Sequence, residues 1–189
     1  EGKKTYSVIS GNTIQTNLCN WAPLGNFSCG IVEDNHFNNC MVGLSGQNIY
    51  IAENTIENCM NNNREVFTTD GGAGGYNGTI VKSGSCTYTL PGADYEEDER
   101  KGTYALFLLD GKGAGQFRRI VSNTKDTITL ESEFYVEPDE NTFAAVVELR
   151  DTMYFVDNYV YNGGDFQFYG MQTNSVVDGL ELERCGGLG

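Results

Sequence analysis

Ile9-Ser-Gly-Asn-Thr-Ile14 is the first occurrence of the pattern that decides the fold of this chain. In the pattern, an Asn has an apolar residue three positions before it and another two positions after it. It returns as Val32-Glu-Asp-Asn-His-Phe37, Ile51-Ala-Glu-Asn-Thr-Ile56 and Phe155-Val-Asp-Asn-Tyr-Val160. A fifth copy places Val177 and Leu182 at the apolar positions and Leu180 at the Asn position. The chain is therefore built on a repeat.

The spacing of the repeat indicates the architecture. Asn12 and Asn35 are 23 residues apart, and Asn35 and Asn54 are 19 apart. A period of about 20 residues matches one coil of a parallel β-helix, whose strands pair with those of the next coil about 4.8 Å away. The apolar positions then point inward, and the Asn occupies a tight bend where it tolerates left-handed geometry. Leucine-rich repeats and propeller blades fit this period and composition less well.

The four Asn-centred segments resemble the pectate-lyase-like superfamily of right-handed parallel β-helices, as found in carbohydrate-active and phage tailspike-like proteins. The resemblance covers roughly residues 6–70 and 150–189. It implies an extracellular or cell-surface protein whose partner is a polysaccharide. No Arg-Pro-Gly-type loop, Asp-Asp pair or calcium cluster of the well-known pectinolytic members is visible in the sequence, so no catalytic residue is carried over. Calcium remains an open cofactor without a clear site.

A long insertion separates the third copy from the fourth, because Asn54 and Asn158 are 104 residues apart. We predict β-helix coils over 1–70 and 149–189 and an inserted, small antiparallel β module over 71–148. Gly71–Gly75 opens the insertion as a flexible hinge, Asp94–Lys101 is a solvated charged turn, and Gly111–Gly115 lies in a tight hairpin. The candidate strands of the module are Gly78–Lys82, Thr87–Leu90, Thr103–Leu109, Phe117–Val121, Thr127–Leu130 and Phe143–Leu149.

Composition and charge exclude several classes of protein. The chain has 189 residues, 24 Gly, 3 Pro and a net charge of −14, which suits a turn-rich all-β protein and argues against nucleic-acid binding. No run of 18 apolar residues indicates a membrane helix. The chain begins at Glu1 without a signal peptide, as expected of a mature form or a fragment. Neither end carries an evident cap, so we expect further coils or another chain to cover the ends.

The six cysteines contain no CxxC pair, which argues against a zinc site. Cys40, Cys59 and Cys185 each follow the Asn position by five residues. We expect Cys40 and Cys59 to stack as reduced side chains on adjacent coils, with a disulfide as the alternative. Cys19 and Cys29 could form a loop disulfide.

The register also points to a candidate site. Met41–Leu44, Arg64–Thr69 and Phe166–Tyr169 are expected to share the sheet that, in the family, commonly lines the substrate groove. If Phe166 and Phe168 point inward, their polar neighbours face the groove. The candidate catalytic residues are Asp70, Asp165, Glu65 and Arg64, with Asp70 and Asp165 as a carboxylate pair. The candidate substrate-binding residues are Gln167 and Tyr169, with Trp21 and Tyr76 stacking on sugars from loops.

These residue types suit two reactions. A glycoside hydrolase needs two carboxylates at a set separation, and a polysaccharide lyase needs a base and a cation. Arg64 and Glu65 could instead form a surface ion pair, Asp70 could be a turn residue, and His36 is expected as an exposed turn residue. The main hypothesis is a segment of a polysaccharide-degrading hydrolase or lyase. The alternative is a non-catalytic glycan-binding or structural surface module of the adhesin or phage-fibre kind.

Overall fold

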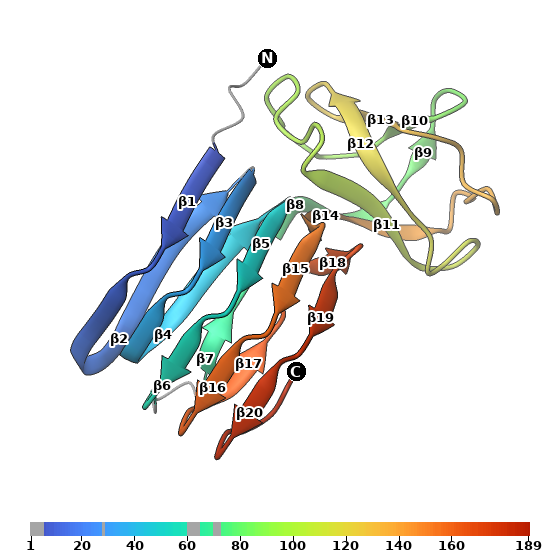
Figure 1. Cartoon of the computed structure of the whole chain (residues 1–189). Helices are drawn as coiled ribbons and strands as arrows, with labels where there is room; N and C mark the ends of the chain where they lie inside the picture. Colours follow the sequence, from blue (N-terminus) through green and yellow to red (C-terminus); the bar gives the residue numbers. More distant parts are fainter. Residues whose placement is uncertain (1–5, 28, 60–64, 70–72) are drawn as a thin grey trace. The chain divides into compact units, whose positions relative to one another are not determined.

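The computed structural model describes residues 6–27, 29–59, 65–69 and 73–189. The chain divides into two compact units, one made of Glu1–Gly71 with Arg150–Gly189 and the other of Gly72–Leu149. The first unit is a solenoid of parallel strands and the second is an antiparallel β module (Figure 1). Within the described ranges there is no helix, and hence none that could span a membrane. The predicted all-β class, a parallel β-helix with a small antiparallel insertion, is confirmed.

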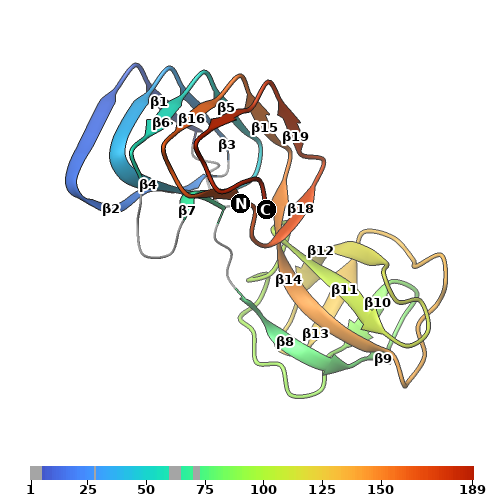
Figure 2. The same ribbon diagram turned by 90° about the horizontal axis from the view of Figure 1, so that it is seen from below.

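Each coil of the solenoid has three faces, and Figure 2 shows the corners of successive coils lying in a row. The first face is a five-stranded parallel sheet of β1 (Tyr6–Ser10), β3 (Cys29–Glu33), β5 (Ile49–Ala52), β15 (Met153–Val156) and β19 (Val176–Asp178). The second face holds the first residues of β2 (Thr13–Phe27) and β4 (His36–Gly46), with β6 (Thr55–Glu57), β16 (Tyr159–Tyr161) and β20 (Glu181–Glu183). The third face holds the later residues of β2 and β4, with β7 (Glu65–Thr68) and β17 (Asp165–Gln167).

The register between coils is the one that the Asn pattern predicts. The apolar residues before the Asn form one column across the first face, made of Ile9, Val32, Ile51, Phe155 and Val177. Those after the Asn form a second column, made of Ile14, Phe37, Ile56, Val160 and Leu182. In the middle coils these side chains are at most 3% exposed and belong to one core. The fifth copy, with Leu180 in place of Asn, is thereby confirmed as a coil.

A ladder of Asn side chains runs along the first corner. Nδ2 of Asn12, Asn35 and Asn54 donates to Oδ1 of the Asn on the next coil, at 3.0, 2.9 and 2.9 Å. The same Oδ1 also accepts the backbone N–H of the preceding Asn. Asn35, Asn54 and Asn158 are each only 2% exposed. Buried amides need such partners, so the ladder both requires and fixes the stacking of the coils.

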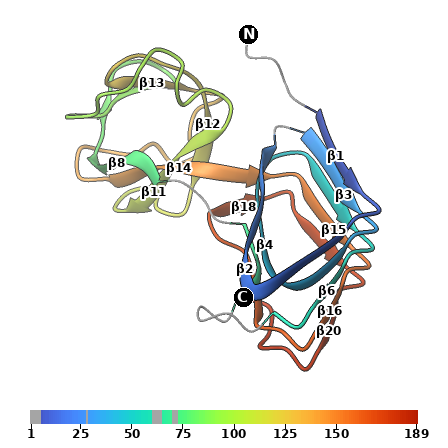
Figure 3. The same ribbon diagram turned by 90° about the vertical axis from the view of Figure 1, so that its left-hand side faces the viewer.

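The left-handed residue of this corner precedes the Asn, which corrects the sequence-based expectation. Asp34, Glu53 and Asp157 have φ of 52°, 53° and 50°, whereas the ladder Asn residues have negative φ. Glycines occupy the same place on the outer coils, where Gly11 and Gly179 have φ of 68° and 63°. The preceding residue makes the bend, so the Asn itself is free to direct its amide inward. Figure 3 shows these corners on successive coils.

The cysteine column is present and reduced. Cys40 and Cys59 form no disulfide, are 0% exposed and share the solenoid core. On the fourth coil the position is Gly163, where a Cβ would lie 3.2 Å from Cγ2 of Val66. The fourth coil therefore has a glycine in the cysteine column, since Val66 fills the space that a cysteine side chain would need. Cys29 is also a free thiol, so the alternative Cys19–Cys29 disulfide is not formed.

Aromatic rings join the coils on either side of the insertion. Phe67 stacks on Phe166, with ring centroids 4.4 Å apart and planes 8° apart. Phe155 meets both rings edge-on at 5.5 and 5.7 Å. Such pairs each add about 0.5–1.5 kcal/mol beyond the burial of their surface. The third and fourth coils thus share a core even though the module separates them in sequence.

The module is a mainly antiparallel sheet, as predicted for the insertion. Its order is β8 (Ala73–Thr79), β14 (Phe143–Asp151), β11 (Tyr104–Asp110), β12 (Phe117–Asn123), β13 (Thr127–Leu130), β10 (Thr87–Thr89) and β9 (Val81–Lys82). The glycine-rich stretch after β11 is the predicted hairpin, because β11 and β12 pair on either side of it. The last residues of β14 already belong to the solenoid, where the remaining short strand is β18 (Met171–Thr173).

One expectation for the module was wrong and another is borne out. The expected glycine hinge is a strand from Ala73 onward, and Gly74 is needed because a Cβ there would lie 1.8 Å from the carbonyl oxygen of Val146. Gly71 lies outside the described residues. The Asp94–Lys101 segment is the expected solvated charged turn, and only Tyr95 within it is buried, at 7% exposed, with its hydroxyl donating to the carbonyl of Gly74 at 2.9 Å.

The ladder yields a stability prediction. Asn54→Ala removes the acceptor of two donors of Asn35 and the donor to Asn158, all in a buried column. Unsatisfied buried polar groups cost about 1–3 kcal/mol each, so we expect the free energy of unfolding to fall by about 3 kcal/mol or more. Asn12→Ala, at the exposed end of the ladder, should cost about 1 kcal/mol or less. Urea denaturation followed by circular dichroism measures both, and equal losses would contradict the ladder as the main constraint.

Candidate functional site

The candidate site lies on the third face of the solenoid. Val42 and Gly43 of β4 pair with Phe67 and Thr68 of β7, and Phe67 pairs in turn with Phe166 of β17. The three segments that the sequence assigned to one sheet therefore do share it. Phe166 is buried, whereas Asp165 and Gln167 are partly exposed, so the predicted alternation of inward Phe and outward polar residues is also found.

Two carboxylates stand side by side on this face. Asp165 of β17 is the direct partner of Glu65 of β7. The register shifts by one residue immediately afterwards, so that Val66 is an extra residue on β7. Bulges of this kind re-aim side chains and are frequent near active sites. Here the bulge buries Val66 and Phe67 in succession and leaves Glu65 partly exposed beside Asp165.

The structure pairs Asp165 with Glu65, whereas the pair predicted from the sequence is Asp165 with Asp70. The sequence does not mark the bulge after Glu65, so the pairing of Asp165 with Glu65 was not predicted. Asp70 and Arg64 lie outside the described residues. Of the four candidate catalytic residues, Glu65 and Asp165 are the two that the structure brings together.

Two polar side chains contact the carboxylates. The hydroxyl of Tyr169 donates to Oε1 of Glu65 at 3.4 Å, and Nε2 of Gln167 donates to Oδ2 of Asp165 at 3.4 Å. Both distances are long for strong hydrogen bonds, so these side chains can exchange partners with a ligand. Tyr169 is 45% exposed and presents both its ring and its hydroxyl at the surface.

Buried hydrogen bonds hold the backbone of Tyr169 in place. Oγ1 of Thr69, which is 0% exposed, donates to the carbonyl of Tyr169 at 2.9 Å and accepts its N–H at 2.8 Å. Nε2 of Gln172 donates to the same carbonyl at 2.9 Å. Nε of Arg150, which is 1% exposed, donates to the carbonyl of Thr69 at 3.1 Å. The position of the Tyr169 backbone is therefore set before any ligand arrives.

The site has two further features that bear on ligand binding. Oε1 of Gln167 is buried and meets no hydrogen-bond donor among the described residues. An unpaired buried acceptor is costly to the fold. On the next coil, a Cβ on Gly186 would lie 1.7 Å from Oδ1 of Asp165. Gly186 thus makes the room that the Asp165 carboxylate occupies.

The other two predicted substrate-binding residues are in strands rather than loops. Trp21 lies in β2 and pairs with Met41, and its side chain is outside the described part of the chain. Tyr76 lies in β8 of the module, where it packs against the module core and its hydroxyl donates to the carbonyl of Thr79. Burial raises the pKa of Tyr76. Neither residue was recognised as strand, because the glycines, Asn and Pro around them favour turns.

The second face carries a polar row that the sequence analysis missed. Nε2 of His36 lies 2.9 Å from Oε1 of Glu57, and the hydroxyl of Tyr159 donates to Oε2 of Glu183 at 2.9 Å. His36 begins strand β4 and is therefore not the turn residue that was expected. Glu57, Tyr161 and Glu183 pair in that order on successive coils. These three residues stand three positions after the Asn position. The repeat described above ends two positions after the Asn, so aligning one more position would have revealed them.

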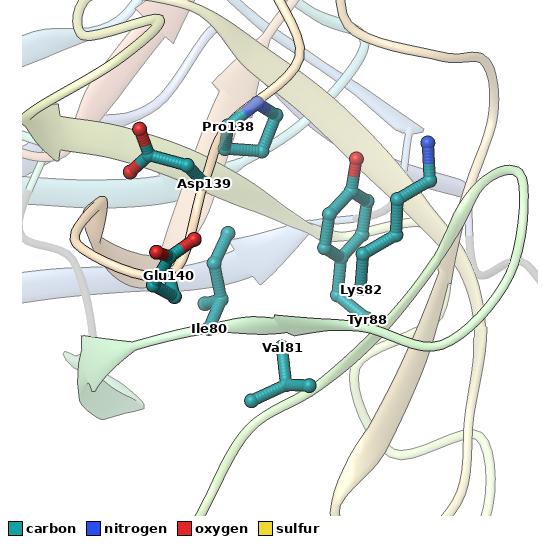
Figure 4. Close-up of a pocket in the computed structure, with 7 residues that line it drawn as sticks. All are labelled: Ile80, Val81, Lys82, Tyr88, Pro138, Asp139 and Glu140. Atoms are coloured by element: carbon teal, nitrogen blue, oxygen red, sulfur yellow. The ribbon is translucent and has the colours of Figure 1, made fainter.

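The module contains a pocket of about 300 Å³ with an apolar base and a charged rim, drawn in Figure 4. It is lined by Ile80, Val81, Lys82, Tyr88, Pro138, Asp139 and Glu140. The hydroxyl of the buried Tyr88 donates to Oε1 of Glu137 at 2.7 Å, and Nζ of Lys82 lies 2.9 Å from Oε2 of Glu137. Burial raises the pKa of Tyr88, and its hydrogen bond to Glu137 adds to this effect. This chain of contacts ties the loop before β14 to β9 and β10, so we regard it as structural.

No cluster of three or more His, Cys, Asp or Glu side chains that could hold a metal ion is found among the residues that the structure describes. The chain matches no model of a known protein family, and no curated protein is significantly similar to it.

The Glu137 contacts predict an acid-sensitive module. Burial alone would raise the pKa of Glu137, but hydrogen bonds from Lys82 and Tyr88 outweigh it and hold the pKa below its ordinary value. A carboxyl whose pKa is lowered in the folded state stabilises the fold above its unfolded pKa of about 4.3 and loses that contribution as the pH falls. We therefore expect the module to lose stability between about pH 5 and pH 3, and Glu137→Gln to reduce this loss.

Thermal unfolding at several pH values measures the effect. Glu140→Gln is the matched control, because it removes an exposed carboxylate on the rim of the same pocket. An acid dependence that is the same in Glu137→Gln as in the unmodified chain would contradict the structural role of Glu137.

Proposed function

We propose that the protein hydrolyses a neutral polysaccharide, with Glu65 and Asp165 as the pair of catalytic carboxylates. The single observation that carries the proposal is the direct pairing of these two residues on adjacent strands of the third face. The resemblance of the Asn-centred segments to pectate-lyase-like β-helices supports a glycan as the substrate.

The separation of the two residues favours a retaining mechanism. The backbones of paired residues on neighbouring strands are about 4.8 Å apart and their side chains project from the same face, which brings the two carboxyl groups close together. Retaining glycosidases place their carboxyl groups about 5–5.5 Å apart, whereas inverting enzymes need about 6.5–9.5 Å to admit a water molecule. In the retaining reaction one carboxylate attacks the anomeric carbon while the other carboxyl protonates the departing glycosidic oxygen. Water then attacks the glycosyl–enzyme ester, and the second group takes up its proton.

The charges near the site favour a neutral glycan. Glu65 and Asp165 would repel the carboxylates of a uronic-acid polymer, and the whole chain carries a net charge of −14. A lyase reaction would also need a cation beside the sugar carboxylate. Arg64, the cation that the sequence places next to Glu65, lies outside the described residues. Hydrolysis needs only the carboxylate pair, so it is the simpler reaction for this face.

Gln167 and Tyr169 are proposed to position the sugar. Nε2 of Gln167 lies beside the Asp165 carboxylate at 3.4 Å, a contact weak enough to be exchanged for one with a sugar hydroxyl. Tyr169 offers an exposed ring for stacking and a hydroxyl already directed at Glu65. Both residues are held on the same strand or directly after it, so they present a fixed pair of contacts around the carboxylates.

The proposal is tested with the intact chain and a panel of soluble neutral polysaccharides, namely xylan, mannan, galactan and mixed-linkage glucan. We expect release of reducing ends from at least one of them and a loss of about 100-fold or more in Glu65→Gln and Asp165→Asn. Asp178→Asn, an exposed carboxylate on the first face, is the control and should keep full activity. Azide rescue of Glu65→Ala or Asp165→Ala identifies the nucleophile.

Two results would refute hydrolysis at this pair. One is the absence of products from every polysaccharide of the panel at high enzyme concentration. The other is full activity in Glu65→Gln or Asp165→Asn with an unchanged thermal midpoint.

A second candidate function is glycan binding without catalysis. It is favoured by the long Tyr169 and Gln167 contacts, since these are features of a binding surface as well as of an active site. Retention on a polysaccharide in affinity electrophoresis without product formation would select this function.

A further inference from the structure

The module carries a tyrosine that is exposed to an unusual degree. Tyr135 lies in the segment between β13 and β14 and is 93% exposed. Its neighbour Phe134 is 5% exposed and belongs to the module core, where it meets Tyr88 edge-on at 5.8 Å. An anchored Phe thus stands directly beside an almost fully exposed Tyr. Exposed aromatic side chains of this kind are enriched at binding sites, because they offer a large contact area with few rotatable bonds.

The backbone beneath Tyr135 is fixed by one side chain. Oε1 of Gln116 accepts the N–H groups of Tyr135 and Val136 at 2.9 and 3.2 Å. Nε2 of the same Gln116 donates to the carbonyls of Val136 and Gly113 at 2.9 and 3.0 Å. Both ends of the Gln116 amide are therefore used to hold this segment against the β11–β12 hairpin. The exposed ring sits on a preorganised backbone, which lowers the entropic cost of binding.

Arg118 supports the ring from one side. Its guanidinium carbon lies 4.8 Å from the ring centroid of Tyr135 and 5.3 Å from that of Phe134. Nε and Nη1 donate to the backbone carbonyls of Glu133 and Phe117 at 2.9 and 2.7 Å. These bonds fix the guanidinium plane, so that the arginine stacks on the tyrosine as a stable layer.

The ring borders an open pocket of about 600 Å³, within the usual range for ligand sites. The pocket is lined by Gly115, Gln116, Phe117, Arg118, Glu131, Ser132, Glu133 and Tyr135. Glu131 accepts the N–H of Arg119 at 3.1 Å and Glu133 accepts the hydroxyl of Ser85 at 2.5 Å. A carboxylate has about four acceptor sites, so each can accept further hydrogen bonds from a ligand.

We infer that this pocket is a second glycan-binding site, in which Tyr135 stacks on a pyranose ring of a neutral polysaccharide and Glu131 and Glu133 accept its hydroxyl groups. The apolar face of a pyranose matches an exposed tyrosine ring, and its hydroxyls match a rim of carboxylates. Two carboxylates against one arginine disfavour an anionic ligand, because two of the arginine's nitrogens already bond to backbone carbonyls. The site lies in the module and needs neither Glu65 nor Asp165, so it goes beyond the proposed hydrolysis and does not depend on it.

The test is affinity electrophoresis of the intact chain in gels that contain xylan, mannan, galactan or mixed-linkage glucan, with polygalacturonate gels as the anionic comparison, followed by calorimetry with the matching hexasaccharide. We expect retardation in at least one gel and at least a 10-fold weaker affinity in Tyr135→Ala. Tyr135→Phe should bind within about 3-fold of the unmodified chain, because stacking needs the ring and not the hydroxyl. Tyr154→Ala removes an exposed tyrosine of the solenoid and serves as the matched control, with affinity unchanged.

The double variant Glu65→Gln with Asp165→Asn separates this site from hydrolysis. Tyr135-dependent binding that persists in this variant supports the inference even when the chain releases no product. The inference is overturned when no gel retards the chain, when Tyr135→Ala binds as tightly as the unmodified chain, or when Tyr135-dependent binding is found only for polygalacturonate. Each of these results leaves the outcome for Glu65 and Asp165 to be read from the reducing-end assay.

Discussion

Asn54 donates a hydrogen bond to Asn158 at 2.9 Å, although 104 positions of chain separate the two residues. Both side chains are 2% exposed, so neither amide could exchange this partner for water without loss. The contact fixes the fourth coil on the third to within one residue, because a slip by one position would turn the amide to the outside. The stacking of coils is therefore set by buried amides and not by the length of chain between them, which is why the solenoid accommodates a whole module between two of its coils.

This constraint explains how far the sequence predicts the fold. Inward positions must satisfy the ladder and the core, so they repeat, and five copies could be aligned down to Leu180 in place of Asn. The bends repeat less strictly, since Gly11, Asp34 and Glu53 all adopt the left-handed conformation. The recurring Asn suggested left-handed geometry at its own position, although its role is to carry the amide. Asn suits both a left-handed bend and a hydrogen-bonded ladder, so the sequence pattern alone cannot decide which of the two roles it has.

The candidate site was harder to predict for a related physical reason. Outward-facing residues take no part in the Asn ladder. Which residue lies opposite them on the next coil depends on turn lengths and bulges, and these are hard to recognise in the sequence. The extra residue Val66 moves the partner of Asp165 to Glu65, and no apolar period could reveal it. The sequence predicts a hinge at Gly74 because a glycine needed for close backbone approach looks the same in a sequence as one that provides flexibility. Tyr135 carries no repeat at all, and only its exposure distinguishes it.

The site and the ladder are nevertheless linked through the third and fourth coils. Glu65 and Asp165 are neighbours only because β7 pairs with β17 across the insertion. That pairing rests on the stacked rings of Phe67 and Phe166 inside the coil and on the ladder at its first corner. The same two coils supply the long-range contact that fixes the fold and the two carboxylates that face outward. The geometry of this outward-facing surface, built from residues 100 positions apart, is therefore fixed by the buried Asn ladder and the stacked rings. Because these inward side chains hold the coils rigidly, the outward side chains can vary and form a functional site.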